Sequence, residues 1–147
     1  QPAKVLAAAS KLDPAPVWRI SRLHEVAASI ERHTSPQDHV LAFWPGYVFE
    51  AGRRFVPGWE NHFALEISEH LTLSQKVRYH VGGKELLLQV VEHQAPAVVV
   101  LGGWMHGINS GISQRHLPVI NQALSTHYEA VASFGEVDVC VRRPRPR

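Results

Sequence analysis

The chain opens with a segment in which apolar residues recur at helical spacing. Within Val17 to His33, apolar positions fall at intervals of three and four and define one face, while the charged residues lie mostly away from it. The sequence Thr34-Ser35-Pro36 then stops the pattern, so we predict a helix over 17–33. The apolar face consists of Ile20, Leu23, Val26, Ala27 and Ile30.

Two later runs have the continuous apolar character of strands that are covered on both faces. The first is HVLAFW at 39–44, and the second is AVVVLGG at 97–103, which ends in a double glycine. The chain closes with YEAVASF and EVDVCVRR, two alternating runs joined at Gly135. Alternation on both sides of a turn residue predicts an antiparallel hairpin over 128–143.

Three helices are expected between and after these strands. Thr72 or Ser74 caps a brief helix through Tyr79, and Gly82-Gly83 breaks it before a second helix over 84–93. A third helix starts near Ser113 and runs to about position 126, with Pro118 tolerated only if it lies in the first turn. The residues that these last two helices bury are expected to be Leu87, Val90 and Val91, and Leu117, Ile120 and Leu124.

This order of elements predicts an α/β fold: a layered, mostly parallel sheet with helices on both faces and a C-terminal antiparallel hairpin. A chain of 147 residues is expected to form one domain, and a domain of that size buries roughly 68–70% of its unfolded surface. We place the single α/β domain at 17–143, between a flexible N-terminal edge at 1–16 and a basic tail at 144–147.

Composition narrows the class of protein. A hydrophobic fraction of 45% with 19% charged residues is ordinary for a globular domain, and no apolar run approaches the roughly 20 residues that span a bilayer. We therefore expect this stretch of chain to be soluble. The single cysteine, Cys140, excludes an internal disulfide and is interpreted as a packing residue. The terminal RRPRPR is either a solvated end or a contact with an anionic membrane surface.

The segment from Val40 to Phe63 is rich in aromatic residues, glycines and prolines, with charged residues between them. It follows the first predicted strand, and the loop WMHGINSG follows the second. Ligands of open sheets bind beyond the carboxyl ends of parallel strands, so these two loops are expected to form one crevice. The candidate ligand-binding residues are Trp44, Tyr47, Glu50, Arg53, Arg54, Trp59, Glu60, Asn61, His62, Trp104, His106 and Asn109. In the alternative interpretation the aromatic rings cover the core and the charges pair with one another.

Motifs for the common chemistries are missing from the sequence. It contains no GxSxG elbow, no GxxxxGK[ST] loop and no GxGxxG turn, and its histidines are scattered without an HExxH helix. Glu66 and Glu69 are more simply the acids of an amphipathic stretch, and no basic stripe interleaved with aromatics indicates nucleic-acid binding. We predict no catalytic residue, no metal, no cofactor and no nucleic-acid partner.

Three runs of the sequence carry a family resemblance: DHVLAFWPGYVFEAGRRFVPGWENHFAL, APAVVVLGGWM and HYEAVASFGEVDVCVRR. Together they resemble the C-terminal soluble domain of multi-spanning membrane glycosyltransferases, which include dolichyl-phosphate-mannose protein mannosyltransferases and bacterial lipid A aminoarabinose transferases. The resemblance covers about 17–143. Its motifs are the strand at Asp38 to Leu41, the aromatic-x-x-glycine-arginine turn at Phe49 to Arg53, and the tyrosine at Tyr128 that opens the hairpin.

The resemblance implies a parent enzyme that transfers a sugar from a polyprenyl-phosphate donor. The family's acidic catalytic residues lie in a loop between early transmembrane helices, which this chain does not contain, so none is carried over. The implied role is a non-catalytic domain on the extracytoplasmic (periplasmic) face of a membrane. It would assist donor or acceptor binding, with the transmembrane helices of the parent protein as its partner.

Two other functions stay open from the sequence. One is a stand-alone α/β ligand-binding protein or small enzyme that uses the same crevice, with His62, His106 or Glu50 as acid or base. The other is a scaffold whose loop only packs on the sheet, which requires Trp44, Phe49, Phe55 and Trp59 to be buried with no concavity between the two loops. Whether the chain has an enzymatic activity of its own is left undecided by the sequence.

Overall fold

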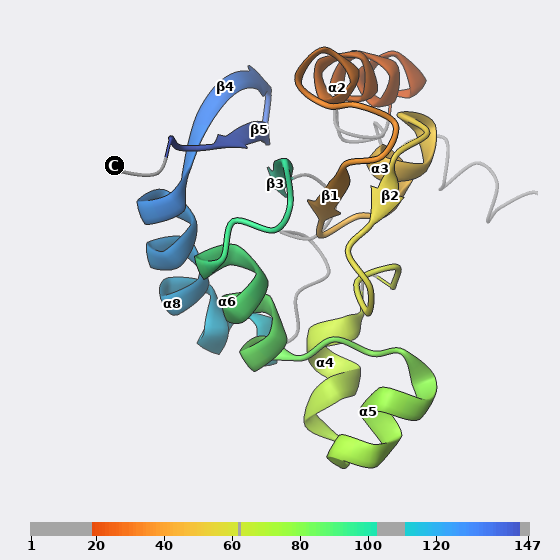
Figure 1. Cartoon of the computed structure of the whole chain (residues 1–147), viewed down its shortest axis with the longest axis vertical. Coiled ribbons are helices and arrows are strands. Elements are labelled where there is room, and N and C mark those ends of the chain that lie inside the picture. Colours follow the sequence, from red (N-terminus) through yellow and green to blue (C-terminus); the bar gives the residue numbers. More distant parts are fainter. Residues whose placement is uncertain (1–18, 62, 103–110, 145–147) are drawn as a thin grey trace, which may run out of the picture.

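A five-stranded sheet organises the chain (Figure 1). The computed structural model describes residues 19–61, 63–102 and 111–144. In the sheet the strand order is β2-β1-β3-β5-β4. The strands are β1 (His39–Ala42), β2 (Arg54–Phe55), β3 (Val98–Gly102), β4 (Tyr128–Phe134) and β5 (Val137–Arg142).

The sheet is mixed rather than mostly parallel. β1 pairs in parallel with both β2 and β3, whereas β5 runs antiparallel to both β3 and β4. The difference from the prediction arises because the C-terminal hairpin inserts its second strand, β5, directly against β3, which makes that pairing antiparallel as well. The α/β class and the antiparallel hairpin at the end of the chain are confirmed.

Six helices are described. α5 begins after Thr72, as one of the two expected caps predicted, and α8 starts before Ser113, so that Pro118 lies inside the helix and not in its first turn. No helix in the described ranges is both long enough and apolar enough to cross a bilayer. The helices are α2 (Ile20–His33), α3 (Gly46–Glu50), α4 (Ala64–Glu69), α5 (Leu73–Tyr79), α6 (Lys84–Glu92) and α8 (Gly111–His127).

Several element limits differ from the prediction. β1 ends at Ala42, two residues before the expected end, and the amphipathic stretch that holds Glu66 and Glu69 forms α4. Ile20 is 71% exposed although it belongs to the expected apolar face, because the packing of α2 begins one turn later, at Leu23. The N-terminal edge 1–16, the start of the first helix at Val17 and the end of the expected second strand at position 103 lie outside the described residues.

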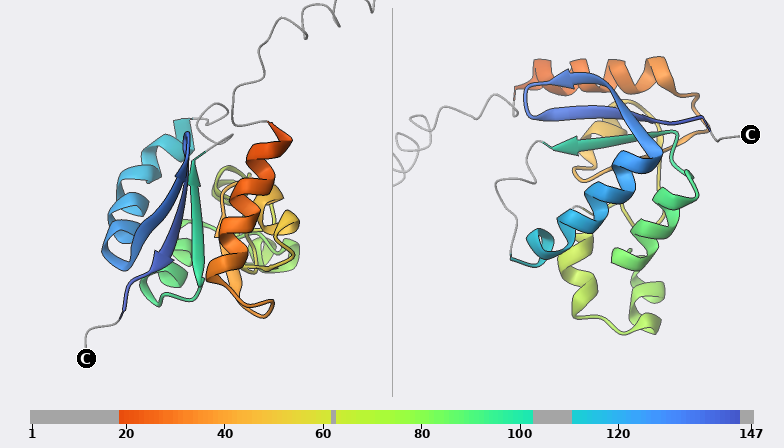
Figure 2. Two further views of the ribbon diagram at one scale, coloured as in Figure 1. Left: turned by 90° about the horizontal axis from the view of Figure 1, so that it is seen from above. Right: turned by 90° about the vertical axis from the view of Figure 1, so that its left-hand side faces the viewer.

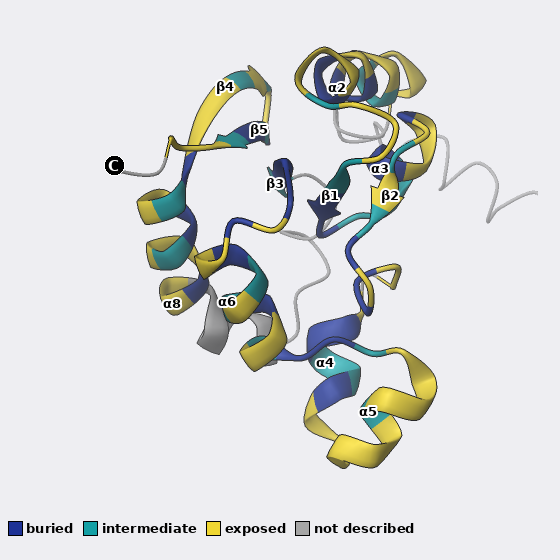
Figure 3. Ribbon diagram, viewed as in Figure 1, coloured by how far each residue is buried: buried dark blue, intermediate teal, exposed yellow. Residues whose placement is uncertain are grey.

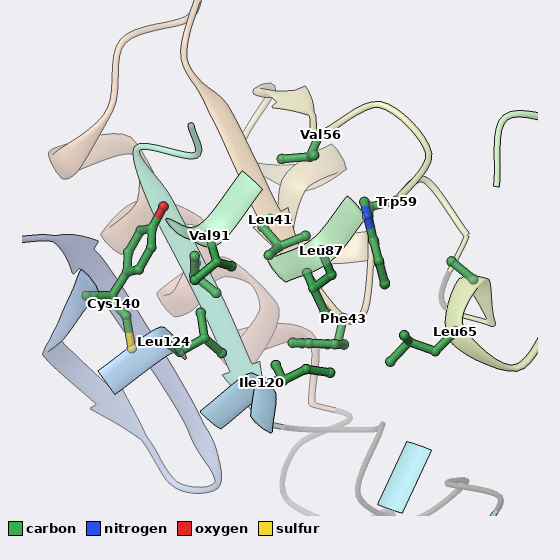
Figure 4. Packing of buried hydrophobic residues seen from close by; sticks show 13 residues of the cluster. Leu41, Phe43, Val56, Trp59, Leu65, Leu87, Val91, Ile120, Leu124 and Cys140 are labelled. Atoms are coloured by element: carbon green, nitrogen blue, oxygen red, sulfur yellow. The ribbon is translucent and has the colours of Figure 1, made fainter. Parts of the chain in front are cut away.

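The buried residues form two clusters that draw on alternate strand positions. Leu41, Val99 and Cys140 join the first cluster together with residues of α4, α6 and α8 (Figure 4). Val40 and Val98, one residue earlier on the same strands, join the second cluster with α2 and α3 (Figure 2). Successive side chains of a strand point to opposite faces, which accounts for this division. The interpretation of Cys140 as a packing residue is confirmed.

The C-terminal hairpin is tied to the rest of the domain at its base. The hydroxyl of Tyr128 donates a 2.9 Å hydrogen bond to the carbonyl oxygen of Pro96, and burial raises the pKa of this phenol despite the nearby charge of Arg142. Gly135 takes the turn with φ +67. The pairing of β4 with β5 shifts register between Ala130 and Ala132, which marks a β-bulge on the edge strand.

Candidate functional site

The carboxyl ends of β1 and β3 lie at the same edge of the sheet. The two strands are parallel neighbours, with Ala42 opposite Val100. The aromatic segment therefore leaves the sheet beside the point where the second loop begins, as the order of elements predicted. Four candidates, His62, Trp104, His106 and Asn109, lie outside the described residues.

Trp44 and Tyr47 pack against each other directly after β1. Their rings meet edge to face with centroids 4.8 Å apart. Tyr47 is 1% exposed, and burial raises its pKa while the charge of Arg22 acts in the opposite direction. Trp44 is only half-buried. A Cβ atom on Gly46 would lie 2.5 Å from the indole of Trp44. Trp44 is therefore only partly covered, whereas Tyr47 belongs to the core.

Trp59 is the residue of the aromatic segment whose indole packs in the first cluster. It is 4% exposed and meets Phe43 edge to face at 6.2 Å. Its indole lies against the backbone of Gly82, where a Cβ would fall 2.5 Å from Nε1, and that nitrogen has no hydrogen-bond partner. This close approach requires glycine at position 82. The sequence pattern predicted only that Gly82 ends a helix.

Two of the charged candidates, Glu50 and Arg53, bind groups in and directly after α2 and within the segment itself. Glu50 accepts a 2.8 Å contact from His24 of α2. Arg53 donates from Nε to the hydroxyl of Thr34 at 2.8 Å and from Nη1 to the carbonyl oxygen of Ala51 at 2.8 Å. These contacts fasten the turn after α3 to the end of α2, so both side chains have structural partners.

The remaining polar candidates are exposed and also have local contacts. Arg54 donates to the side chain of Gln37. Glu60 accepts a 2.8 Å hydrogen bond from the amide of Gly58, and Asn61 accepts one of 2.9 Å from the amide of Phe63. Such carboxylate and amide contacts shape tight turns. Whether any of these groups also contacts a ligand stays a prediction.

The scaffold interpretation requires four aromatic residues to be buried, and only one of them is. Trp59 is buried, Trp44 and Phe55 are half-buried, and Phe49 is 78% exposed. The described part of the segment therefore combines a packed inner half with aromatic surface.

A groove that the sequence reading did not anticipate lies between α5, α6 and the Pro57-Gly58 turn. It has a volume of about 550 Å³. The apolar pair Leu73 and Val77, one turn apart on α5, could have indicated an apolar wall. The sequence around the pair does not indicate which other segment it faces. The groove is lined by Pro57, Gly58, Leu73, Lys76, Val77, His80, Val81, Gly83, Glu85, Leu86 and Gln89.

A smaller pocket of about 120 Å³ adjoins this groove. The two share Lys76 and Glu85 in their linings. The Nζ atom of Lys76 lies over Gly83, where a Cβ would fall 3.2 Å from it and 3.3 Å from the hydroxyl oxygen of Ser68. The small pocket is lined by Leu65, Ser68, Glu69, Lys76, Lys84 and Glu85.

A third cavity, of about 350 Å³, lies at the end of β5. Gln94 is buried there with φ +51, and its amide donates to the carbonyl oxygens of His127 at 3.1 Å and Arg143 at 2.9 Å. Arg143 also donates to the carbonyl oxygen of Tyr128. These hydrogen bonds connect the end of β5 to the start of β4, so the polar groups around this cavity have a structural role.

The described residues contain no group of three or more His, Cys, Asp or Glu side chains placed to hold a metal ion. Comparison with known proteins found no protein-family model, no curated protein and no solved structure that matches this chain.

Proposed function

We propose that this chain is a non-catalytic domain of a membrane-bound glycosyltransferase that uses a polyprenyl-phosphate-linked sugar donor. In this role it lies on the extracytoplasmic (periplasmic) side of the membrane, contacts the transmembrane helices of the parent protein and assists binding of donor or acceptor. The proposal includes a layered domain with helices on both faces of the sheet, which is supported by the two clusters of strand and helix residues.

The observation that carries the proposal is the parallel pairing of β1 with β3. It brings the half-buried Trp44 to the edge where the second loop leaves the sheet. The electron-rich face of an aromatic ring attracts the C–H groups of a sugar ring, as it attracts the positive edge of a second aromatic ring. The resemblance of the three sequence runs to the family supports the same assignment. The tail that begins after Arg143 is the proposed contact with an anionic membrane surface.

A tryptophan-fluorescence titration tests ligand binding at this edge. The chain is titrated with free hexoses and with a polyprenyl phosphate analogue, and we expect a change in emission that Trp44→Ala abolishes. Phe49→Ala is the matched control, because it removes an exposed aromatic ring from α3, the short helix that follows Trp44. No change with any titrant, together with full transfer activity of a parent enzyme carrying Trp44→Ala, would contradict the ligand role.

The reading frame upstream of Gln1 tests the membrane-bound parent separately. We expect several hydrophobic segments of about 20 residues in it. A start codon close to Gln1 would overturn the parent assignment and leave the stand-alone binding protein as the interpretation of the same edge.

The scaffold remains a second candidate because of one observation. Glu50 and Arg53 are engaged by His24, Thr34 and Ala51 at 2.8 Å, which fastens the turn after α3 to α2. If this is the whole function of the segment, substitutions at Trp44 leave transfer unchanged while substitutions at Arg53 lower the stability of the domain.

A further inference from the structure

Two buried tyrosines differ in what their hydroxyl groups bind. Tyr47 is 1% exposed and Tyr128 is 3% exposed. The hydroxyl of Tyr128 donates to the carbonyl oxygen of Pro96 at 2.9 Å, whereas the hydroxyl of Tyr47 has no hydrogen-bond partner among the described residues. Buried tyrosine hydroxyls usually have a partner, as most buried polar side-chain atoms do. The described part of the fold therefore leaves one donor and acceptor unused at Tyr47.

Tyr47 lies at the edge of the sheet where β1 and β3 end. It is the second residue of α3, the helix that follows β1, and its ring meets the indole of Trp44 with centroids 4.8 Å apart. α3 packs against α2, which is buried on one side and exposed on the other (Figure 3). The unused hydroxyl is thus carried by a residue that contacts the proposed ligand-binding tryptophan.

Arg22 reaches the same edge from the first turn of α2. Its Nη2 lies 3.8 Å from the point where a Cβ on Gly135 would stand. Gly135 forms the hairpin turn next to Val137, which pairs with Gly102 at the end of β3. Burial raises the pKa of Tyr47 and the charge of Arg22 acts against it, so the two side chains lie within electrostatic reach of each other.

The guanidinium of Arg22 is held in place and still has unused donors. Its side chain is 26% exposed, and its Nη1 pairs with the carboxylate of Glu25 at 3.1 Å. Nη2 and Nε have no hydrogen-bond partner among the described residues. The pair offers both donors and acceptors and carries no net charge. It is therefore suited to a neutral ligand with several hydroxyl groups, which both donate and accept hydrogen bonds.

We propose that the edge at Trp44 binds the sugar ring of its ligand, with the hydroxyl of Tyr47 and the guanidinium of Arg22 hydrogen-bonded to sugar hydroxyl groups. The inference rests on the proposed ligand role of this edge and names the part of the donor or acceptor that lies there. The phosphate of a lipid-linked donor lies outside these contacts. Arg22 is a ligand-binding residue that the sequence did not predict.

Calorimetric titration of the chain with glucose, galactose and mannose, and separately with inorganic phosphate, tests the class of ligand. We expect saturable binding of at least one hexose, with one ligand per chain. Phosphate is expected to bind at least about tenfold more weakly, because it lacks the ring contact with Trp44 and meets a charge-neutral pair. An affinity for phosphate that equals the affinity for the hexose would overturn the assignment of a neutral ligand.

Tyr47→Phe tests the unused hydroxyl, since it keeps the ring and removes only the oxygen. We expect hexose binding to weaken by about fivefold, while the urea midpoint of unfolding stays the same or rises because no internal hydrogen bond is lost. Tyr128→Phe is the matched control. Its hydroxyl is bound to Pro96, so it is expected to lower the midpoint and to leave hexose affinity unchanged. A lower midpoint with unchanged affinity in Tyr47→Phe would show an internal role for that hydroxyl and overturn the proposal.

Arg22→Gln tests the guanidinium. It is expected to weaken hexose binding by about tenfold, because a charge-assisted hydrogen bond is lost. Arg32→Gln is the matched control, since it removes an exposed charge from the last turn of the same helix, and we expect it to bind as the parent chain does. Far-UV circular dichroism establishes that every variant is folded.

The outcomes separate this inference from the proposed function. Hexose binding that Trp44→Ala abolishes, but that neither Tyr47→Phe nor Arg22→Gln changes, would overturn the inference and leave the ligand role of the edge intact. Absence of hexose binding to the parent chain would overturn both. A start codon close to Gln1 would overturn the membrane-bound parent alone, because the sugar contacts do not depend on it.

Discussion

The backbone amide of Gly82 donates a 2.7 Å hydrogen bond to the carbonyl oxygen of Gly58. This bond joins the Pro57-Gly58 turn of the aromatic segment to the stretch before α6. Both positions exclude side chains. A Cβ on Gly58 would lie 2.9 Å from the nitrogen of Gly82, and one on Gly82 would lie 3.0 Å from the oxygen of Gly58.

Gly58→Ala is expected to destabilise the domain by roughly 2–5 kcal/mol. The substitution forces a side chain onto a residue with φ +88, at a cost of roughly 1–2 kcal/mol, and crowds the opposite backbone, at a further cost of roughly 1–3 kcal/mol. Chemical denaturation measures the loss. Gly52→Ala is the control, because φ is +58 and a Cβ there meets nothing within 4 Å. Equal losses in the two variants would refute the close approach.

Arg53→Lys is expected to lower the free energy of unfolding by about 1–2 kcal/mol. Lysine cannot reproduce the fork in which Nε donates to Thr34 and Nη1 donates to Ala51. A double-mutant cycle with Thr34→Val isolates the first of these bonds. Arg54→Lys, at an exposed neighbouring position, is expected to stay within about 0.5 kcal/mol of the parent. A coupling energy of zero in this cycle would show that the hydrogen bond between Arg53 and Thr34 contributes nothing to the free energy of unfolding.

Asp38 is expected to make the stability of the domain depend on acid pH. Its Oδ2 accepts hydrogen bonds from the amide of Ser35 at 2.7 Å and from its hydroxyl at 2.9 Å. The amide, and then the hydroxyl, hold the pKa of Asp38 below its usual value of 3.8. The stabilisation is therefore complete above the unfolded pKa and is lost as the pH falls through the lower folded value.

Thermal unfolding measured between neutral pH and about pH 2 tests this dependence. In Asp38→Asn the position carries no titratable group, so its stability is expected to fall less steeply below the usual aspartate pKa. Ser35→Ala retains the backbone donor and removes the hydroxyl, and an intermediate slope is expected. Identical acid profiles for the parent chain and Asp38→Asn would rule out the contribution.

Cys140 is expected to resist thiol reagents in the folded protein. Burial, and secondarily the charge of Asp138, raises the pKa of this thiol to about 11. The thiolate fraction at pH 8 is then about a hundredfold lower than for an exposed thiol, since reactivity follows the thiolate. The measurement is the rate of labelling by a chromogenic disulfide reagent in native buffer, divided by the rate in denaturant. Rapid labelling of the native protein would show that the strand pair is open at this position.

The elements that the sequence predicted well are those with strong and uninterrupted patterns. β3 is a continuous apolar run, the hairpin strands alternate in character, and α2 and α6 carry apolar stripes of several turns. Their burial follows from the same residues that define the pattern. The two-residue strand β2 has no pattern of its own, because it exists only through its pairing with β1.

The site was predicted less completely because its parts depend on contacts between distant segments. The sequence placed Trp44 and Trp59 in one loop with the same role, yet Trp59 is buried since Gly82 approaches it from a segment more than twenty residues away. The groove has the same origin. Its walls come from α5, α6 and a turn near Pro57, and no local spacing links them.

The bulge on β4 determines how the sheet ends. The register shift between Ala130 and Ala132 interrupts the row of peptide groups that an outer strand presents to a neighbour. At the opposite end β2 offers only two residues, one of them the exposed Arg54. Both borders of the sheet are therefore poor templates for a strand from another molecule, which protects the domain from growing into sheet-linked aggregates when it is concentrated.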